Sequence, residues 1–225
     1  MKKSIVILTL LFVCLMLCAC TKTEAEKEIT DAVATVNGES IAPEELEYFK
    51  GKLKAQVLND YLAEYSIKYM PDFWNREFDG KTPEQTLNEQ ALEKCILAKL
   101  QFVLMREKGI YTDITYQGLY NKALAFNEAN SSKEGVVGLK SIKMEQFYSY
   151  YLDNGIMELR NLLAKDEIKP TEQEINDRIT QLKASGEQVD ENALRSVAAS
   201  KLIREKYEAY IAGLRASAMI EILGN

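Results

Sequence analysis

The 225-residue sequence contains no histidine. Histidine is the side chain that most often acts as a general base near neutral pH, so its absence removes the commonest route to acid–base catalysis. The sequence also lacks a glycine-rich phosphate loop, a spacing typical of metal ligands and a Gly-x-Ser-x-Gly nucleophile elbow. We therefore expect a protein that is not an enzyme and that holds no cofactor and no metal.

Basic residues are also fewer than acidic residues. The chain has 28 lysines and arginines against 34 aspartates and glutamates, a net charge of −6. If Lys2 and Lys3 leave with a cleaved leader, 26 basic residues remain and the net charge becomes −8. Nucleic-acid-binding proteins neutralise phosphates with lysine and arginine, so this balance argues against nucleic acid as a partner. The same balance gives the body of the protein no electrostatic attraction to an anionic membrane.

The apolar run at residues 5–19 is too short to span a bilayer, which takes about 20 residues. Lys2 and Lys3 precede it, and this pattern is typical of a secretory signal. The run ends in Leu17-Cys18-Ala19-Cys20, which resembles the bacterial lipobox with Cys20 as the lipidated residue. The alternative is an ordinary signal peptide with an incidental cysteine. We expect residues 1–19 to be a lipoprotein signal peptide and residues 20–31 a polar tether. Acyl chains on Cys20, such as palmitate, would anchor the protein outside the cytoplasmic membrane, since stable anchoring requires more than one chain.

Cysteine is sparse, with four residues in the chain. Cys14 and Cys18 would leave with the signal peptide and Cys20 would be acylated, so Cys95 alone remains and no disulfide can form within the mature chain. We expect Cys95 to be a small buried hydrophobic residue rather than a nucleophile, because its neighbours on a helix face are apolar: Leu92, Ile96 and Leu100.

Two short β-prone segments lie far apart in the sequence. Residues 33–36 and 40–41 flank Asn37-Gly38, the strongest short signal for a hairpin turn. A hairpin this small is not stable alone, and the other strand-like run in the mature chain is residues 219–223. We therefore predict that the two ends of the mature chain meet in one small sheet. Alternation along the last strand should turn two side chains toward the helices and one toward water: Ile220 and Ile222 inward, Glu221 outward.

The rest of the mature chain has the three- and four-residue apolar spacing of helices. Pro43 begins the first one, Thr82 and Thr171 open capping boxes, and Gly109 ends a helix. The predicted helices span about 43–66, 83–108, 113–130, 144–164 and 171–184, with a last one from 190. Within them we expect Asn154-Gly155 to be a bend, Asp190 to be a cap, and one group of carboxylates to form a solvated face: Glu44, Glu45 and Glu47. The predicted fold is mostly α, a multi-helix body closed by a small β patch from the N-terminal hairpin and the C-terminal strand.

Three segments carry a resemblance to a known family. Ala34-Thr-Val-Asn-Gly-Glu-Ser-Ile-Ala-Pro-Glu-Glu-Leu46 resembles the opening of the SurA/PrsA-like extracytoplasmic chaperones and foldases. The segment Tyr210-Ile-Ala-Gly-Leu-Arg-Ala-Ser-Ala-Met-Ile-Glu-Ile-Leu223 resembles the end of the same family. Between them, Asp79-Gly-Lys-Thr-Pro-Glu-Gln-Thr-Leu-Asn-Glu-Gln-Ala-Leu92 resembles the second long helix of its lipoprotein members. The resemblance covers most of the mature chain and implies one chaperone domain at residues 32–225.

The chain departs from that family at one place. Full-length foldases of the family carry a parvulin-type prolyl isomerase domain before the last helix, and such a domain takes about 90 residues. Here residues 185–189 join the two helices directly, and the chain has none of the histidines around which the parvulin site is built. We therefore expect a non-enzymatic holdase that binds unfolded secreted proteins. The alternatives are a structural or adaptor lipoprotein that binds one specific partner and, third, a peptidyl-prolyl isomerase-like foldase.

A holdase needs exposed, adaptable apolar side chains, which aromatic residues and methionine supply. Four aromatic residues within positions 147–151 cannot all face one side of a helix. The alternative for any one candidate is a place in the helical core. The candidate peptide-binding residues are Phe73, Trp74, Met144, Phe147, Tyr148, Tyr151 and Met157.

The lipobox interpretation predicts the effect of one substitution. Cys20→Ser should abolish lipidation, because acylation requires the thiol, and should release the protein or leave its signal uncleaved. Mass spectrometry of the mature amino terminus measures both effects, and an unlipidated mature terminus at another residue would contradict the interpretation.

Overall fold

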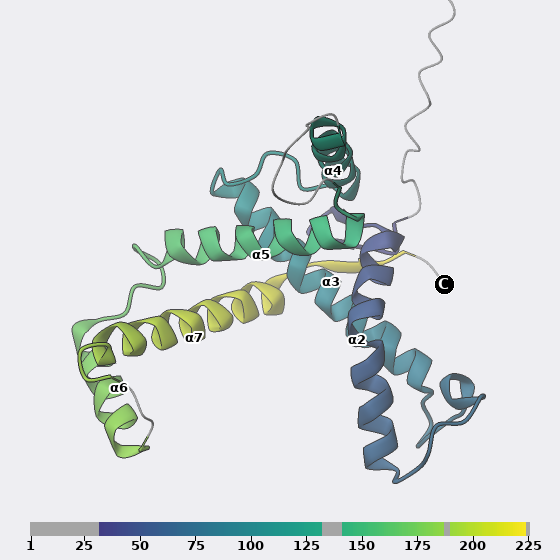
Figure 1. The fold of residues 1–225 in the computed structure, drawn as a ribbon, viewed down its shortest axis with the longest axis horizontal. Helices are drawn as coiled ribbons and strands as arrows, with labels where there is room; N and C mark the ends of the chain where they lie inside the picture. The colour runs from purple at the N-terminus through teal and green to yellow at the C-terminus, as the bar shows by residue number, and fades with distance from the viewer. Residues whose placement is uncertain (1–31, 132–140, 187–189, 224–225) are drawn as a thin grey trace, which may run out of the picture. The chain divides into compact units, whose positions relative to one another are not determined.

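The structure is a computed structural model that describes residues 32–131, 141–186 and 190–223 (Figure 1). Within this part the chain forms six α-helices, one short 3-10 helix and three strands, so the fold is mostly helical, as predicted. The leader predicted at residues 1–19, the lipidation site Cys20 and the tether predicted at residues 20–31 lie outside the described residues.

The strands form one antiparallel sheet in the order β2-β1-β3. Strands β1 (Ala34–Val36) and β2 (Glu39–Ile41) make the hairpin, and its turn residues Asn37 and Gly38 both have positive φ, 51° and 84°. Strand β3 (Ile220–Ile222) pairs with the other edge of β1. The predicted meeting of the two ends is therefore confirmed.

Contacts next to the strands reinforce this closure. The backbone N–H of Asn37 donates to the carbonyl of Met219 at 2.8 Å, and the Met219 N–H donates to the Asn37 side chain at 2.9 Å. Just before β3, the guanidinium of Arg215 donates two hydrogen bonds to the Glu93 carboxylate, at 2.9 and 2.8 Å. The end of the chain is thus held by the hairpin turn and by the helix that contains Glu93.

The helices begin and end near the predicted positions. The capping box of Thr82 and Gln85 is formed, and so is that of Thr171 and Glu174. Gly109 has φ of 74°, the left-handed conformation expected just past a helix end. The elements are α2 (Pro43–Glu64), η1 (Phe73–Asn75), α3 (Pro83–Glu107), α4 (Tyr116–Ser131), α5 (Met144–Leu163), α6 (Glu172–Ala184) and α7 (Leu194–Ser217).

Two local predictions are wrong. Asp190 does not cap α7, because its carboxylate accepts from the Asn192 N–H at 2.8 Å in a turn that precedes the helix. Gly155 does not interrupt α5, which runs through it. A Cβ at Gly155 would lie 2.6 Å from the sulfur of Met105 and 2.8 Å from the Tyr111 ring, so this glycine permits close packing of α5.

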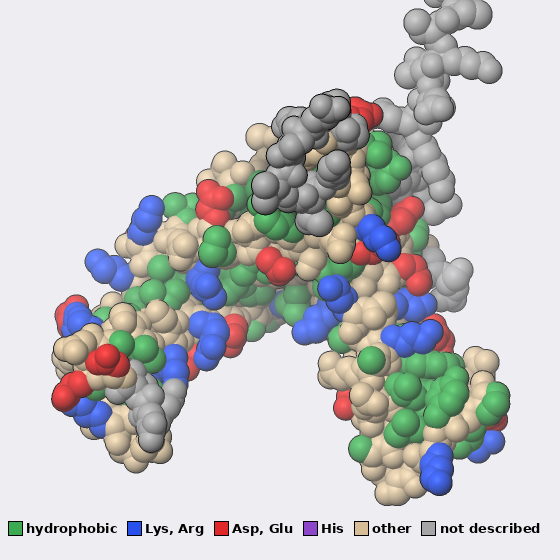
Figure 2. All heavy atoms as spheres, in the orientation of Figure 1, with side chains coloured by type: hydrophobic (Ala, Val, Ile, Leu, Met, Phe, Trp, Pro, Cys, Tyr) green, Lys and Arg blue, Asp and Glu red, His purple; other side chains and the backbone are tan. Residues whose placement is uncertain are grey.

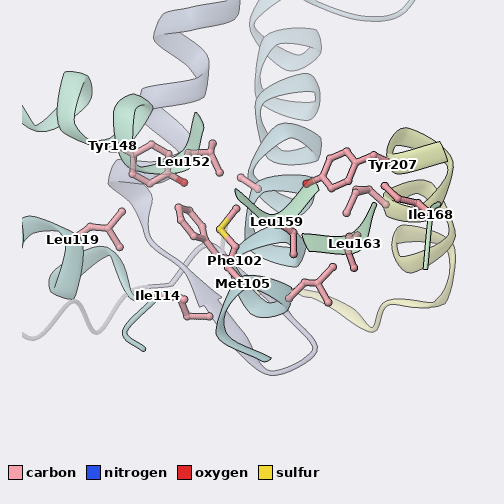
Figure 3. Packing of buried hydrophobic residues seen from close by; sticks show 13 residues of the cluster. Phe102, Met105, Ile114, Leu119, Tyr148, Leu152, Leu159, Leu163, Ile168 and Tyr207 are labelled. Atoms are coloured by element: carbon pink, nitrogen blue, oxygen red, sulfur yellow. The ribbon is translucent and has the colours of Figure 1, made fainter. Parts of the chain in front are cut away.

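Helix α3 is the central element, because it contacts α2, α5, α7, η1 and the strands β1 and β2. Its Cys95 is buried, as predicted, and burial raises the pKa of the thiol, which makes it a poor nucleophile. The largest apolar cluster joins α3 to α4, α5 and α7 (Figure 3). Its labelled members are Phe102, Met105, Ile114, Leu119, Tyr148, Leu152, Leu159, Leu163, Ile168 and Tyr207.

Helices α6 and α7 pack directly on each other. Arg178 of α6 donates to both carboxylate oxygens of Glu205 of α7, at 2.7 and 2.6 Å. Lys206 pairs with Glu174 at 2.7 Å, and hydrogen bonds from Lys206 and from the Thr171 backbone lower the pKa of the Glu174 carboxyl to about 2. A separate apolar cluster lies beneath these pairs and contains Ile175, Leu182, Leu194, Ala198 and Leu202.

The predicted alternation in β3 is right at two of its three positions. Ile220 packs against the apolar cluster beneath the sheet, and Glu221 is exposed. Ile222 is 66% exposed, so the prediction that it faces the helices is wrong. It lies opposite Ala34 near the end of the strand, where the helical layer no longer covers it. Strand parity fixes which face a side chain takes, but not how far the layer beneath extends.

The two isoleucines of β3 provide a matched test of the sheet. Ile220→Asp should lower the free energy of unfolding by about 1–3 kcal/mol, because it places a carboxylate against an apolar cluster. For a chain of this length, each kcal/mol corresponds to about 2–4 °C in Tm. Ile222→Asp, at the exposed position, should change Tm much less, and deletion of residues 218–225 should lower it at least as far as Ile220→Asp. Thermal unfolding by circular dichroism measures all three, and an unchanged Tm after the deletion would contradict the closed sheet.

Candidate functional site

A buried ion pair lies at the junction of three helices. Glu45 of α2 and Lys99 of α3 are each 2% exposed, and their charged groups are 3.0 Å apart. The Glu45 carboxylate also accepts from the Ala42 N–H at 2.8 Å and from the Tyr148 hydroxyl of α5 at 3.2 Å. The ion pair thus joins the start of α2 to α3 and α5.

The prediction that Glu45 belongs to a solvated face is wrong, although Glu44 and Glu47 are exposed. Two signals in the sequence point to the pair. Glu45 is the third residue of a helix that begins with proline, where a carboxylate can accept the N–H of the capping residue. Lys99 falls in the apolar stripe of α3, four residues after Cys95 and three before Phe102. An acid and a base at core positions of neighbouring helices are the pattern that identifies a buried pair.

Tyr148, whose hydroxyl donates to the Glu45 carboxylate of this ion pair, lies inside the protein. This side chain is buried, and burial together with the charge of Glu45 raises the pKa of its hydroxyl well above the ordinary value. Its ring centroid lies 4.7 Å from that of Tyr48 and 5.9 Å from that of Phe102. Phe147 is also buried. Both candidates are therefore core residues in this structure, although one edge of Tyr148 reaches a pocket.

That pocket lies where α2, α4 and α5 begin, and its volume is about 330 Å³. Burial raises the pKa of Tyr116 to about 12, and the nearby carboxylates of Glu44 and Glu145 add to the shift. The surface is therefore apolar on its walls and negative at its edge. The lining residues are Pro43, Glu44, Glu47, Tyr48, Tyr116, Met144, Glu145 and Tyr148.

The remaining candidates on α5 point in different directions. Tyr151 is half-buried and its ring stacks on Tyr111 with centroids 3.9 Å apart. Met157 is exposed and lines a different pocket, beside Ile110. The most exposed aromatic residue of α5 is Tyr150, at 63%, which was not among the candidates. The geometric argument that four aromatic residues cannot share one helix face separates 148 from 150, and the packing of Tyr148 against the core leaves Tyr150 outward.

The α2–α3 connection carries a group of partly exposed apolar side chains. Phe73 of η1 is fully buried among the rings of Tyr61, Phe78 and Trp74. Around this centre, hydrophobic side chains gather on the surface in Figure 2, over the end of α2 and over η1. We call this the connection surface, and its residues are Leu62, Tyr65, Ile67, Tyr69, Met70 and Trp74.

The structure therefore divides the candidates into three places. Phe73 and Trp74 are neighbours in the α2–α3 connection, with centroids 5.2 Å apart. Met144 and Tyr148 line one pocket, whereas Phe147 and Tyr151 stack beside it and Met157 lies elsewhere on α5.

Among the described residues, none of the helices combines the length and the apolar character needed to cross a membrane. The same residues contain no group of three or more acidic or cysteine side chains placed to hold a metal ion.

The chain is similar to a foldase. It is 27% identical over 183 residues to the foldase protein PrsA of Caldanaerobacter subterraneus subsp. tengcongensis. The match covers 74% of this chain and 58% of that protein, so the chain spans little more than half of its relative. No protein-family model and no solved structure matches the chain. The comparison supports a distant PrsA-like relation.

The buried pair can be tested with one single and one double variant. Lys99→Met should lower the free energy of unfolding by about 3–5 kcal/mol, because it leaves the Glu45 carboxylate buried without its cation. Adding Glu45→Gln should restore most of this loss, since the neutral amide oxygen still accepts from Ala42 and the amide N–H can donate to the Tyr148 hydroxyl. Urea unfolding measures both. A double variant no more stable than Lys99→Met would show that the uncompensated charge is not the cause.

Proposed function

We propose that the protein is a membrane-anchored, non-enzymatic chaperone of the holdase type, which binds unfolded secreted proteins outside the cytoplasmic membrane. The observation that carries this proposal is the connection surface. Lipidated Cys20 would supply the anchor, and the distant similarity to a foldase favours clients that are unfolded proteins.

The chemistry of the connection surface suits a changing set of apolar ligands. Tyr69 is 56% exposed, and Trp74 and Met70 are partly exposed beside it. Aromatic rings offer broad apolar faces with a polar tip, and methionine adapts its shape to irregular partners. Contiguous apolar surface of this kind on a soluble protein marks an interaction site.

Charged groups frame this surface. The ammonium of Lys54 lies 5.2 Å from the centroid of the Trp74 ring, and Arg76 pairs with Asp72 at 2.9 Å. Like charges on neighbouring molecules repel, so such a frame opposes self-association while leaving the apolar centre accessible. A holdase requires this combination, because it must bind clients without aggregating itself.

Two features support a non-enzymatic role. Helices α6 and α7 pack on each other at the position where full-length foldases of the SurA/PrsA-like family carry their isomerase domain. The chain also has no histidine to serve as a general base. Clients would therefore be held rather than isomerised.

The purified protein should suppress aggregation of a chemically denatured client, measured by light scattering, without accelerating prolyl isomerisation of a short peptide. Tyr69→Ser should weaken client binding by about threefold to tenfold, because it removes an exposed aromatic anchor. Tyr120→Ser is the matched control, since Tyr120 is an exposed tyrosine on α4, outside the connection surface.

Three outcomes would contradict this proposal. An isomerisation rate clearly above background, lost on mutation of this chain, would support the foldase alternative. A single tight, stoichiometric partner with no suppression of aggregation would support the adaptor alternative. Equal effects of Tyr69→Ser and Tyr120→Ser would mean that the connection surface is not the binding site.

A further inference from the structure

The pocket at the start of α2, α4 and α5 combines aromatic walls with carboxylates. Tyr48, Tyr116 and Tyr148 supply ring faces or edges, and Met144 adds a flexible apolar side chain. Three carboxylates, those of Glu44, Glu47 and Glu145, line the same pocket, and among the described residues no lysine or arginine does. The connection surface is instead framed by Lys54 and by the ion pair of Arg76 with Asp72. The two sites therefore differ in chemistry.

Two of the three carboxylates are available for a ligand. Glu47 is paired with Lys50, at 3.1 Å. Glu44 and Glu145 are exposed and, among the described residues, form no ion pair. Their charges already act on the pocket, because they contribute to the raised pKa of Tyr116.

The starts of three helices meet here, and helix starts attract anions through their unpaired N–H groups and partial positive charge. At each of these helix starts one N–H group already donates to a neighbouring side chain. The Ala42 N–H donates to Glu45, the Lys143 N–H to Gln146, and the Gly118 N–H to the Thr115 hydroxyl. Full carboxylate charges therefore set the sign of the pocket, and an anionic ligand is disfavoured.

Two lysines, Lys52 and Lys143, lie next to pocket residues without lining the pocket. Lys52 lies one helical turn after Tyr48, with its ammonium 5.4 Å from the ring centroid. This ammonium already covers one face of the Tyr48 ring, so a ligand would use the rest of the pocket wall. Lys143 precedes Met144 and is exposed, and it is not among the lining residues.

We propose that this pocket binds a lysine or arginine side chain of an extended client segment, a preference that rests on the proposed holdase function. The aliphatic stem of such a side chain packs on the tyrosine rings and Met144, and its cationic head reaches Glu44 and Glu145. A volume of about 330 Å³ accommodates one or two side chains, not a folded partner. The connection surface then holds apolar client segments, and the pocket selects those that carry a positive charge.

The test uses fluorescein-labelled peptides of the sequence Gly-Ala-Phe-Ala-X-Ala-Phe-Ala-Gly, with arginine, citrulline or glutamate at X. Citrulline has the shape of arginine without the charge. By fluorescence anisotropy, the purified protein should bind the arginine peptide about fivefold to tenfold more tightly than the citrulline peptide. The double variant Glu44→Gln/Glu145→Gln should remove this difference, whereas Glu208→Gln/Glu221→Gln, an equal change of charge at two exposed positions outside the pocket, should keep it.

The outcomes separate this proposal from the proposed function. Equal affinities for the arginine and citrulline peptides, with aggregation of a denatured client still suppressed, would overturn the pocket assignment alone. Tighter binding of the glutamate peptide would overturn it as well. That result would show that the partial positive charge of the helix starts, and not the carboxylates, determines which ligand charge the pocket prefers. Failure to bind any peptide and to suppress aggregation would overturn both. Thermal unfolding of the double variant must match that of the unaltered protein. If it does not, Glu145→Gln alone should still reduce by about half the difference in affinity between the arginine and citrulline peptides.

Discussion

The arrangement of the helices around α3 depends on the buried pair of Glu45 and Lys99. Removing an ammonium and a carboxylate from water costs several kcal/mol for each ion, and their attraction offsets this only with good geometry and full hydrogen bonding. Here the carboxylate accepts from Ala42 and Tyr148 as well as from Lys99. Because those donors belong to different elements, the pair tolerates one alignment of α2, α3 and α5. It is better explained as a constraint on alignment than as a source of stability.

This constraint reaches the sheet as well. Ala42 directly follows β2, so the hydrogen bond from its N–H to Glu45 fixes the step from the hairpin into α2. The hairpin in turn supplies β1, on which β3 pairs. The same carboxylate therefore influences the seating of the sheet on α3 and the depth of Tyr148 in the core. The pocket beside Tyr148 is a consequence of the same alignment.

Local chemistry made most of the fold predictable. The Asn37-Gly38 turn and the capping boxes at Thr82 and Thr171 act over three or four residues, so the sequence is sufficient to place them. The burial of Glu45 could not be placed in this way, because it depends on a lysine 54 positions away. The exposure of Ile222 likewise depends on how far the layer beneath the sheet extends.

The candidate site was predicted less well than the fold. Aromatic and methionine side chains line both the pocket and the connection surface, and the peptide-binding role of the candidates stays a prediction. Which members face outward is decided by packing between distant elements. Phe73 and Tyr148 fill the core, whereas their near neighbours Trp74 and Tyr150 reach the surface. Periodicity gives the relative orientation of such neighbours, and only the partner helices decide which of them is buried.

The independent packing of α6 on α7 makes their junction a modular position. Ion pairs such as Arg178–Glu205 and a separate apolar cluster hold these two helices together, while the later part of α7 also joins the main core. Lengthening the connection between them would add loop-closure entropy of only about 0.6 kcal/mol per doubling of its length. A longer connection at this junction is therefore compatible with the rest of the architecture.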